Sequence, residues 1–511
     1  MTLEQREQSG LHITIPEFRL LPREEALKEL MLPCGRFKSL FGIEERFRLY
    51  ITKQLARADF FPNRNLIVAP GTPLNWHMLL EYLVRESVLA SPRIGFRSLR
   101  NDHPQIHSLR LKPRNLTSES DGLQVYYGGF GSTASFEQSL SKAIGETLER
   151  FSFARYKSDS LTKTTYAALK QQGISVLNPK ILNGFLPWQR ELFPELGFRE
   201  EDTLEWVEGY ELESGKKAWI PAQMVFWSYQ HDRKSKGPVL LNATTSGCGG
   251  HFSREEAILA ALLEAIERDG FIIYWLNALP PPIIETSKRD DLGIHEMLEN
   301  LKRYGLEAHF LNTSSDIGIP SVTCAIVDKS KSTPCLAIGS CAGFDRKEIF
   351  TRALEEALSV FVSIASLPSF VLPADYQPFS MRDIGRLDRL ALWRGVAMLE
   401  RFAFFTKGKK QDADEIMGNV EQYSSAEERL ACVQKRMREL GEGYEIYIYE
   451  AGHPALDTLG YHAIRAIVPQ LFPLYLYEHM ATLDSKRLRE VPKKLGYETT
   501  GELNPLPHPF P

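Results

Sequence analysis

The spacing of apolar and polar positions divides the chain into strand-like and helix-like stretches. Runs rich in β-branched and aromatic residues, typical of strands, occupy residues 206–212, 322–327 and 444–449. Amphipathic stretches, which predict helices, begin at four capping residues: Ser135, Ser253, Asp345 and Ser425. Because strands and helices alternate from residue 122 onward, the pattern predicts an α+β (mixed α/β) domain of layered sheets and helices.

The first part of the chain has a less regular pattern. Helices are expected at residues 22–32 and 44–58, and a short apolar run at residues 66–69 is typical of a strand. The polar stretch 101–121 contains Pro, Asn and Ser, which favour loops, so we place a domain boundary there. The interpretation is an accessory domain at residues 1–110, for partner or peptide binding, and a main domain at residues 111–511.

An internal repeat carries the strongest functional signal. Three segments share a glycine-rich stretch, a helix cap and acidic residues three turns later: GGFGSTASFEQSLSKAIGETLER, SGCGGHFSREEAILAALLEAIERDG and GSCAGFDRKEIFTRALEEALSV. Three residues after each cap stands the partner expected of a capping box, namely Gln138, Glu256 and Glu348. The same spacing from each cap reaches Glu146, Glu264 and Glu356, and three residues further on Glu149, Glu267 and, breaking the pattern, Ser359.

Helix geometry places the two glutamates of a repeat on one face, because they lie about one turn apart. Several carboxylates meeting in one place would repel each other, and Mg²⁺ with nucleotide phosphates is the natural way to hold them. The commoner alternative is a solvated, salt-bridged helix face. Three copies in matched register, and the apolar stretch ILAALLEAIERDGFIIYW, favour a partly buried site. The glycines fit turn chemistry and phosphate contact equally well.

Composition narrows the function class. The chain has 511 residues, 43% of them apolar and 25% charged, as expected for a folded protein with a large core. The net charge of −4 and the lack of a basic tract argue against nucleic acid. Six cysteines without a C-x-x-C pair argue against a zinc site and indicate free thiols in a reducing cytosol. With no signal-peptide pattern and no long apolar segment, we expect a cytoplasmic protein without a membrane span.

The acidic helices identify a family resemblance. KAIGETLER, EEAILAALLEAIERD and the segment from Arg352 to Glu356 resemble the three helix motifs of the YcaO family, and the ending NPLPHPFP resembles the proline-rich terminus of its azoline-forming members. The resemblance covers about residues 115–511. It implies a YcaO-type ATP-binding domain and a cyclodehydratase of thiazole/oxazole-modified peptides, as in bacteriocin biosynthesis.

The resemblance also implies roles for individual residues. Mg²⁺ would be held by Glu146, Glu149, Glu264 and Glu267. ATP would be contacted or oriented by those four and by Arg150, Arg268, Arg352 and Glu356. Two positions depart from the family pattern: Phe130 replaces a lysine and Ser359 replaces a glutamine, which puts details of the ATP contacts in doubt.

The implied reaction begins when a Cys, Ser or Thr side chain of a precursor peptide attacks the preceding amide carbon. The oxyanion takes the γ-phosphoryl group of ATP, and phosphate then leaves to give a thiazoline or oxazoline. Alternating prolines favour an extended C-terminal arm that threads into a cleft, so catalytic positions are expected at Pro507, Pro509 and Pro511. A loose terminus is the alternative.

The resemblance implies a ribosomal precursor peptide as substrate and a separate leader-binding partner that resembles ubiquitin-activating enzymes. It also implies a flavin-dependent dehydrogenase as a further partner and a homo-oligomer. Thioamide or macrocyclic amidine formation, a catalytically silent peptide-binding scaffold, and a small-molecule kinase or ligase remain as alternatives. His251 and His508 are expected to be structural, and no base pairs with Cys248 or Cys341 to make a nucleophile.

Overall fold

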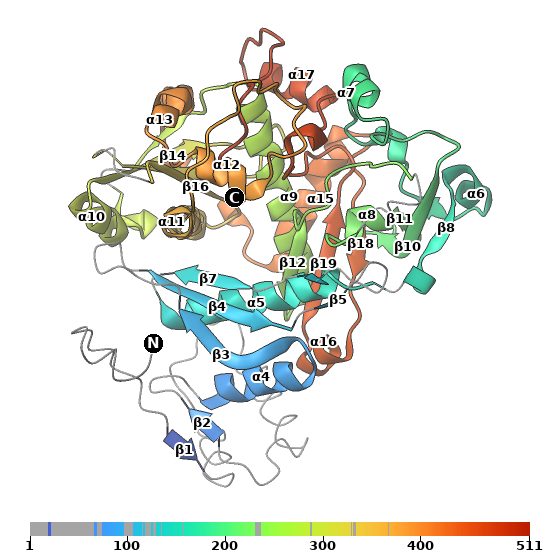
Figure 1. Cartoon of the computed structure of the whole chain (residues 1–511), viewed down its shortest axis with the longest axis horizontal. Helices are drawn as coiled ribbons and strands as arrows, with labels where there is room; N and C mark the ends of the chain where they lie inside the picture. Colours follow the sequence, from blue (N-terminus) through green and yellow to red (C-terminus); the bar gives the residue numbers. More distant parts are fainter. Residues whose placement is uncertain are drawn as a thin grey trace.

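The computed structural model covers most of the chain after residue 73 (Figure 1). The described residues are 19–21, 66–68, 74–96, 106–114, 116–117, 124–125, 129–133, 135–156, 158–229, 237–286, 289–328, 330, 334–365, 367–418 and 420–510. The helices expected at residues 22–32 and 44–58 lie outside them. The strand expected at residues 66–69 is confirmed as β2 (Leu66–Val68), which pairs with β1 (Arg19–Leu21).

A three-stranded antiparallel sheet forms the lower layer in Figure 1. It consists of β3 (Leu89–Phe96), β4 (His107–Pro113) and β7 (Phe130–Thr133), and it packs against α4 (Leu74–Arg85) and α5 (Phe136–Phe153). Leu80, Leu109 and Leu140 belong to one apolar core. The expected division after residue 110 therefore falls inside β4 in the structure.

A seven-stranded sheet forms the second layer. Its order is β12 (Cys248–His251), β19 (His462–Ile467), β18 (Tyr447–Glu450), β10 (Thr203–Glu211), β11 (Lys217–Pro221) and β9 (Ser175–Val176), with β8 (Thr162–Thr165) beside β10. The long helix α9 (Arg254–Leu276) packs on β12 and β19. The strands expected at residues 206–212 and 444–449 are confirmed as β10 and β18.

A five-stranded sheet forms the third layer. Its order is β16 (Leu336–Ala342), β15 (Ser321–Asp328), β14 (Leu306–Asn312), β13 (Ile283–Glu285) and β17 (Lys410–Asp412). α11 (Arg346–Ile364) covers β16 and β15, and α9 also contacts β16. The strand expected at residues 322–327 is confirmed as β15. Three sheets layered with helices confirm the predicted mixed α/β class.

The remaining elements connect these layers. The helices are α6 (Tyr166–Gln171), α7 (Pro187–Leu192), α8 (Ala222–Val225), α10 (His295–Arg303), α12 (Arg386–Leu392), α13 (Ala397–Phe402), α14 (Ala413–Met417), α15 (Ala426–Leu440), α16 (Pro454–Leu459) and α17 (Lys486–Lys494), and the short strands β5 (Leu116–Thr117) and β6 (Gln124–Val125) form a pair. Among the described residues, no helix is both long and apolar enough to cross a membrane.

The three sequence repeats fold as three strand–helix units, β7–α5, β12–α9 and β16–α11. The predicted glycine loops are wrong for Gly131, Gly249, Gly250 and Gly339, which lie inside the strands, whereas Gly129, Gly247 and Gly343 lie just outside them. A Cβ atom on Gly131 would lie 1.6 Å from the Ser139 carbonyl oxygen, and one on Gly339 would lie 2.3 Å from the Ala357 amide nitrogen. These glycines let each helix lie almost directly on its strand.

The predicted helix caps are confirmed. Ser135, Ser253 and Asp345 each accept a hydrogen bond from the backbone N–H three residues later, at 3.4, 3.3 and 2.7 Å. Such a bond satisfies one of the unpaired amides at the start of a helix and fixes where it begins. The return bond that completes a capping box occurs in α15, whose predicted cap is also confirmed: the Glu428 carboxylate accepts from the Ser425 amide.

Candidate active site

The first acidic helix, α5, presents Glu146 and Glu149 three turns after its cap. One Glu146 carboxylate oxygen accepts a hydrogen bond from the Phe130 amide of β7, and the other pairs with Nη2 of Arg150 at 2.5 Å. The Glu146 side chain is 28% exposed, so a ligand can reach it. The strand therefore fixes the glutamate from one side and leaves the other side open.

The second acidic helix, α9, places two glutamates around one arginine. Nη1 of Arg268 lies 2.5 Å from Glu267, and its Nη2 lies 3.2 Å from Glu264. Glu267 is buried, whereas the side chain of Glu264 is 25% exposed. One guanidinium thus pairs with two carboxylates at the edge of the core and offsets one of their two negative charges.

The third acidic helix, α11, follows the same plan as α5. The Glu356 carboxylate accepts a hydrogen bond from the Ser340 amide of β16 at 2.8 Å. Here, as in α5, the strand amide lies 16 positions before its glutamate. Arg352, expected beside the nucleotide, pairs with Glu348 at 2.9 Å, and both side chains are about half exposed.

The three helices come close enough for their carboxylates to repel each other. Burial raises the pKa of Glu149 well above its ordinary value, and the charges of Glu264 and Glu146 raise it further. Burial raises the pKa of Glu267 to about 7, which Arg268 opposes and the charges of Glu356 and Glu264 reinforce. Carboxylates on α5, α9 and α11 therefore share one electrostatic site.

This site fits a divalent cation by charge. Two arginines pair with three of its carboxylates, and within the described residues no three His, Cys, Asp or Glu side chains stand at metal-binding spacing. Carboxylate oxygens are the donors that Mg²⁺ prefers, and raised carboxyl pKa values mark a place where positive charge is favoured. Glu146, Glu149, Glu264 and Glu267 remain the predicted Mg²⁺ ligands.

Two further basic residues contact these helices, and sequence reasoning missed one of them, Arg465. Arg465, buried on β19, lowers the pKa of both Glu149 and Glu264, and its guanidinium donates to the Met224 and Thr244 carbonyls at 2.9 Å. Lys142 on α5 reaches the buried Glu355 on α11 at 2.8 Å. In the sequence, Arg465 stands among apolar residues in the strand HAIRAI, and this position could have indicated a buried, functional arginine.

The C-terminal arm ends beside the acidic site. Residues 507–510 are buried, so the loose terminus considered as the alternative is wrong for them, and the predicted insertion is confirmed. The Phe510 ring lies against Phe271, with ring centres 4.8 Å apart, and Cζ of Arg268 stands 4.1 Å from the centre of the Phe510 ring. Pro511, one of the three predicted catalytic prolines, lies outside the described residues. The chemical roles of Pro507 and Pro509 remain predictions.

The remaining candidates are structural. His508 is buried between Arg389 and the Tyr475 carbonyl, and His251 accepts a hydrogen bond from the Ser253 amide at 3.0 Å. Cys248 and Cys341 are buried, and burial raises the pKa of each thiol to about 12, which keeps both protonated and weakly nucleophilic. At one departure from the family pattern, Ser359 donates to the Ser132 hydroxyl at 3.0 Å.

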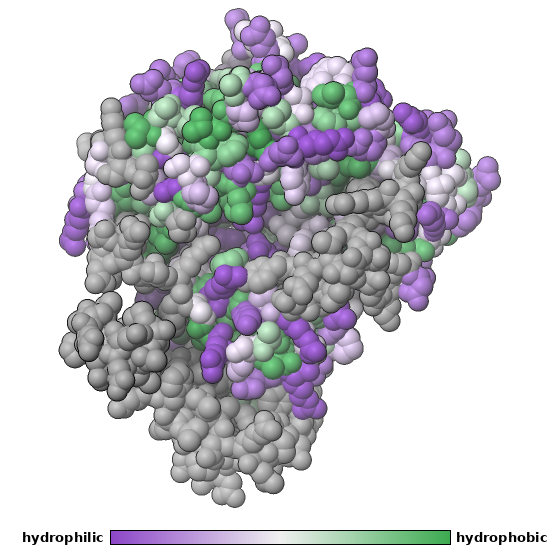
Figure 2. Space-filling view, viewed as in Figure 1, coloured by the Kyte–Doolittle hydropathy of each residue, from purple (hydrophilic) through white to green (hydrophobic). Residues whose placement is uncertain are grey.

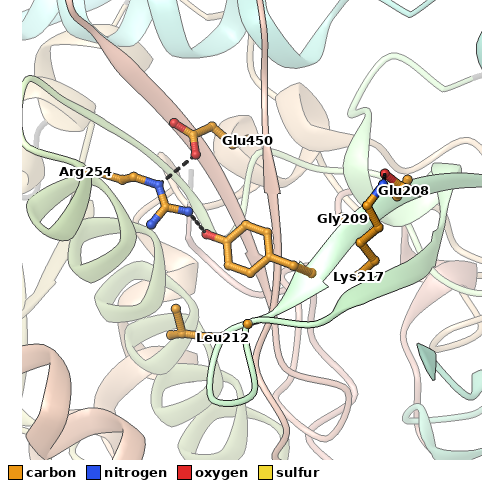
Figure 3. A pocket seen from close by; sticks show the side chains of 8 residues that line it. Glu208, Gly209, Leu212, Lys217, Arg254 and Glu450 are labelled. Atoms are coloured by element: carbon orange, nitrogen blue, oxygen red, sulfur yellow. Dashed lines mark hydrogen bonds and ion pairs between the residues drawn. The ribbon is translucent and has the colours of Figure 1, made fainter. Parts of the chain in front are cut away.

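A separate pocket of about 580 Å³ lies at the N-terminal end of α9, beside the β10–β11 hairpin (Figure 3). Arg254 points between Tyr210 and Glu450, at 2.5 and 2.8 Å, and Lys217 pairs with Glu208 at 2.7 Å. These charged side chains already satisfy each other. None of the predicted Mg²⁺ ligands, Glu146, Glu149, Glu264 and Glu267, lines this pocket, and we assign no ligand to it.

Comparison with known proteins agrees with the site. The family model described as YcaO cyclodehydratase, ATP- and Mg²⁺-binding, matches residues 130–472. An uncharacterized protein of Methanothermobacter thermautotrophicus is 28% identical over 237 residues, which is 46% of this chain and 57% of that protein. The chain thus spans little more than half the length of this relative.

Solved structures share the fold. A heterocyclase in complex with substrate and cofactor has a TM-score of 0.66 at 19% identity, over 84% of this chain and 57% of its own. YcaO from Methanopyrus kandleri, bound with AMPPCP and Mg²⁺, has a TM-score of 0.54 at 19% identity, over 80% of this chain and 91% of its own. The Escherichia coli microcin synthetase McbBCD complex with pro-MccB17 bound has a TM-score of 0.51 at 13% identity, over 81% of this chain and 96% of its own.

Proposed function

Since this chain belongs to the YcaO family of ATP- and Mg²⁺-binding proteins, we propose that it is a cyclodehydratase that closes Cys, Ser or Thr side chains of a ribosomal precursor peptide to azolines. The observation that carries the proposal is the shared electrostatic site of α5, α9 and α11, where the carboxyl pKa values of Glu149, Glu264 and Glu267 are raised. Buried like charges are expensive, so their presence calls for a cationic ligand.

The residues divide into two proposed roles. Glu146, Glu149, Glu264 and Glu267 would hold Mg²⁺, which would offset the charge of the nucleotide phosphates. Arg150, Arg268, Arg352 and Glu356 would bind or orient ATP. Arg150 and Arg268 now pair with the glutamates. A cation on those glutamates would release both guanidiniums toward phosphate oxygens, which they bind well.

In the proposed reaction, the peptide side chain forms a bond to the carbon of the preceding amide and loses its proton. The amide oxygen then takes the γ-phosphoryl group, and ADP leaves. The amide nitrogen loses its proton and forms a double bond to the carbon as the carbon–oxygen bond breaks and phosphate departs. One water equivalent is lost from the peptide, and one ATP becomes ADP and phosphate. Amide oxygen is a poor leaving group, and its phosphorylation makes the elimination possible.

The proposal includes protein partners. The similar heterocyclase binds a substrate, and the microcin synthetase is a complex with pro-MccB17 bound. Both support a peptide substrate and a separate leader-binding protein here. Apolar side chains gather on the upper part of the face shown in Figure 2. Leu387 and Val371, 61% and 80% exposed, are among the exposed apolar side chains of the chain. A flavin-dependent dehydrogenase and a homo-oligomer remain predictions.

The experiment combines purified protein, ATP, Mg²⁺, the partner encoded by a neighbouring gene and a candidate precursor. The peptide should lose the mass of one water molecule per ring, whereas thioamide formation would exchange oxygen for sulfur and a silent scaffold would turn over no ATP. Glu264→Gln and Glu267→Gln should abolish ATP turnover, and Glu427→Gln, on the exposed face of α15, should leave it unchanged. Normal turnover in both site variants would contradict the proposed site.

A further inference from the structure

The C-terminal arm contacts α9 and the end of α12, and two of its backbone carbonyls are hydrogen-bonded there. The indole of Trp275 on α9 donates to the Leu506 carbonyl at 3.1 Å, and the indole of Trp393 at the end of α12 donates to the Pro507 carbonyl at 2.9 Å. Prolines have no amide hydrogen, so their carbonyls are the groups that such donors can hold. These two bonds fix the position of the arm against α9 and α12.

A buried arginine holds the next residue of the arm. Nη1 of Arg389, on α12, lies 2.9 Å from Nδ1 of His508 and also contacts its Nε2, while Nε2 lies 2.9 Å from the Tyr475 carbonyl oxygen. Because that carbonyl can only accept, Nε2 carries the proton and Nδ1 accepts from Arg389. Burial lowers the pKa of His508 well below its ordinary value, and the Arg389 charge lowers it further, so the ring is neutral. The imidazole is therefore held from two sides.

The rest of the Arg389 environment is costly to maintain. Within the described residues, its Nε and Nη2, both carboxylate oxygens of Glu478 and the Tyr475 hydroxyl are buried without a hydrogen-bond partner. Burial raises the pKa of Glu478 to about 7, and the Arg389 charge opposes that rise. Apolar residues would fill this space at lower cost. A buried charge that is expensive for stability points to a positional role.

The contacts of the arm reach from Arg389 to the acidic site. Two residues after His508, the Phe510 ring covers the guanidinium of Arg268, which pairs with Glu267 and Glu264. If His508 left its contacts with Arg389 and Tyr475, Phe510 would move away from Arg268. Arg268 would then lose the aromatic face against which its planar group is stacked.

We propose that Arg389 is a positioning residue for the active site: it clamps His508 and thereby keeps Phe510 stacked on Arg268. Its effect on catalysis rests on the proposed function, whereas its effect on the arm does not. Arg389→Met should therefore release the arm and lower kcat for ATP turnover more than it changes KM. Arg389→Lys, which can still donate to Nδ1 of His508, should restore part of the arm's position and part of the kcat.

Hydrogen exchange of the C-terminal peptide, followed by mass spectrometry, tests the clamp without ATP. Loss of a charge-assisted hydrogen bond should make the arm amides exchange about tenfold to a hundredfold faster in Arg389→Met. Arg401→Met, an exposed position on α13, is the control and should exchange like the wild type. His508→Asn, whose amide can accept and donate as the imidazole does, should hold the arm better than His508→Leu.

The outcomes separate the two proposals. Unchanged exchange in Arg389→Met refutes the clamp and leaves the cyclodehydratase proposal intact. A freed arm with unchanged kcat refutes the positioning role. If the wild type turns over no ATP with any precursor, the proposed function fails, while the exchange data still decide whether Arg389 holds the arm. Should Arg389→Met misfold, Arg389→Met/Glu478→Gln removes both buried charges and gives the same readout.

Discussion

The variant Glu267→Gln measures the electrostatic strain in the acidic site. Glu267 is 7% exposed, and its pKa is raised from an ordinary 4.5 to about 7, first by burial. Because the folded protein favours the protonated form, the stabilising contribution is fully present below pH 4.5 and is lost as the pH rises through 7. A pKa change of this size corresponds to about 3 kcal/mol at alkaline pH.

Glutamine has the shape of the protonated glutamate and does not titrate, so the variant should avoid that loss. At pH 8, without nucleotide, Glu267→Gln should be more stable than the wild type by up to about 3 kcal/mol, which for a chain of this size is roughly 3 °C in Tm. At pH 4.5 the two proteins should be equally stable. Mg²⁺ with ATP should raise the Tm of the wild type at pH 8 and raise that of the variant much less.

Differential scanning fluorimetry measures the Tm of each protein at pH 4.5 and pH 8, with and without Mg²⁺–ATP. Glu490→Gln, an exposed substitution on α17, serves as the control and should change none of these Tm values. A variant that is less stable than the wild type at pH 8 would show that the ion pair of Glu267 with Arg268 outweighs the cost of burying its charge. Equal stabilisation of both proteins by Mg²⁺–ATP would refute the cation-binding role.

Further predictions concern packing, buried charge and thiols. Arg487→Met leaves the fully buried Asp269 carboxylate, now 2.5 Å from Nη2 of Arg487, without its cationic partner and should lower stability by about 3 kcal/mol, measured by chemical denaturation. Gly339→Ala would place a methyl group 2.3 Å from the Ala357 amide nitrogen and should destabilise by about 1–3 kcal/mol in the same assay. Cys248 and Cys341, whose pKa values are raised to about 12 by burial, should resist iodoacetamide at pH 8 until the protein is unfolded, as peptide mapping would show.

Local chemistry explains what could be predicted from sequence. A side-chain cap and a fixed helical spacing operate within one turn or one helix, so the starts of α5, α9 and α11 and the faces of their glutamates follow from residue order alone. The glycines were misread because glycine permits both a turn and a close strand–helix contact. Only packing distinguishes the two uses, and in this fold each of the three helices lies against its preceding strand.

Long-range contacts explain what sequence reasoning missed. Arg465 reaches Cys248 across 217 positions of the chain, and Arg389 reaches His508 across 119. No periodicity links residues so far apart, and a lone arginine within apolar residues is only a weak signal. The burial of the arm was predictable from its prolines and the family resemblance, whereas the residue that clamps it was not.

The arginines also explain how the acidic site can exist before a ligand binds. Arg150 and Arg268 stand one turn after Glu146 and Glu264, at the same position of two repeats. Each offsets one of the two glutamate charges on its own helix, so a fold that brings several carboxylates together avoids part of the repulsion. The same guanidiniums match phosphate geometry. A repeat that carries both a carboxylate and an arginine is therefore suited to exchange an internal ion pair for a metal on one group and a phosphate on the other.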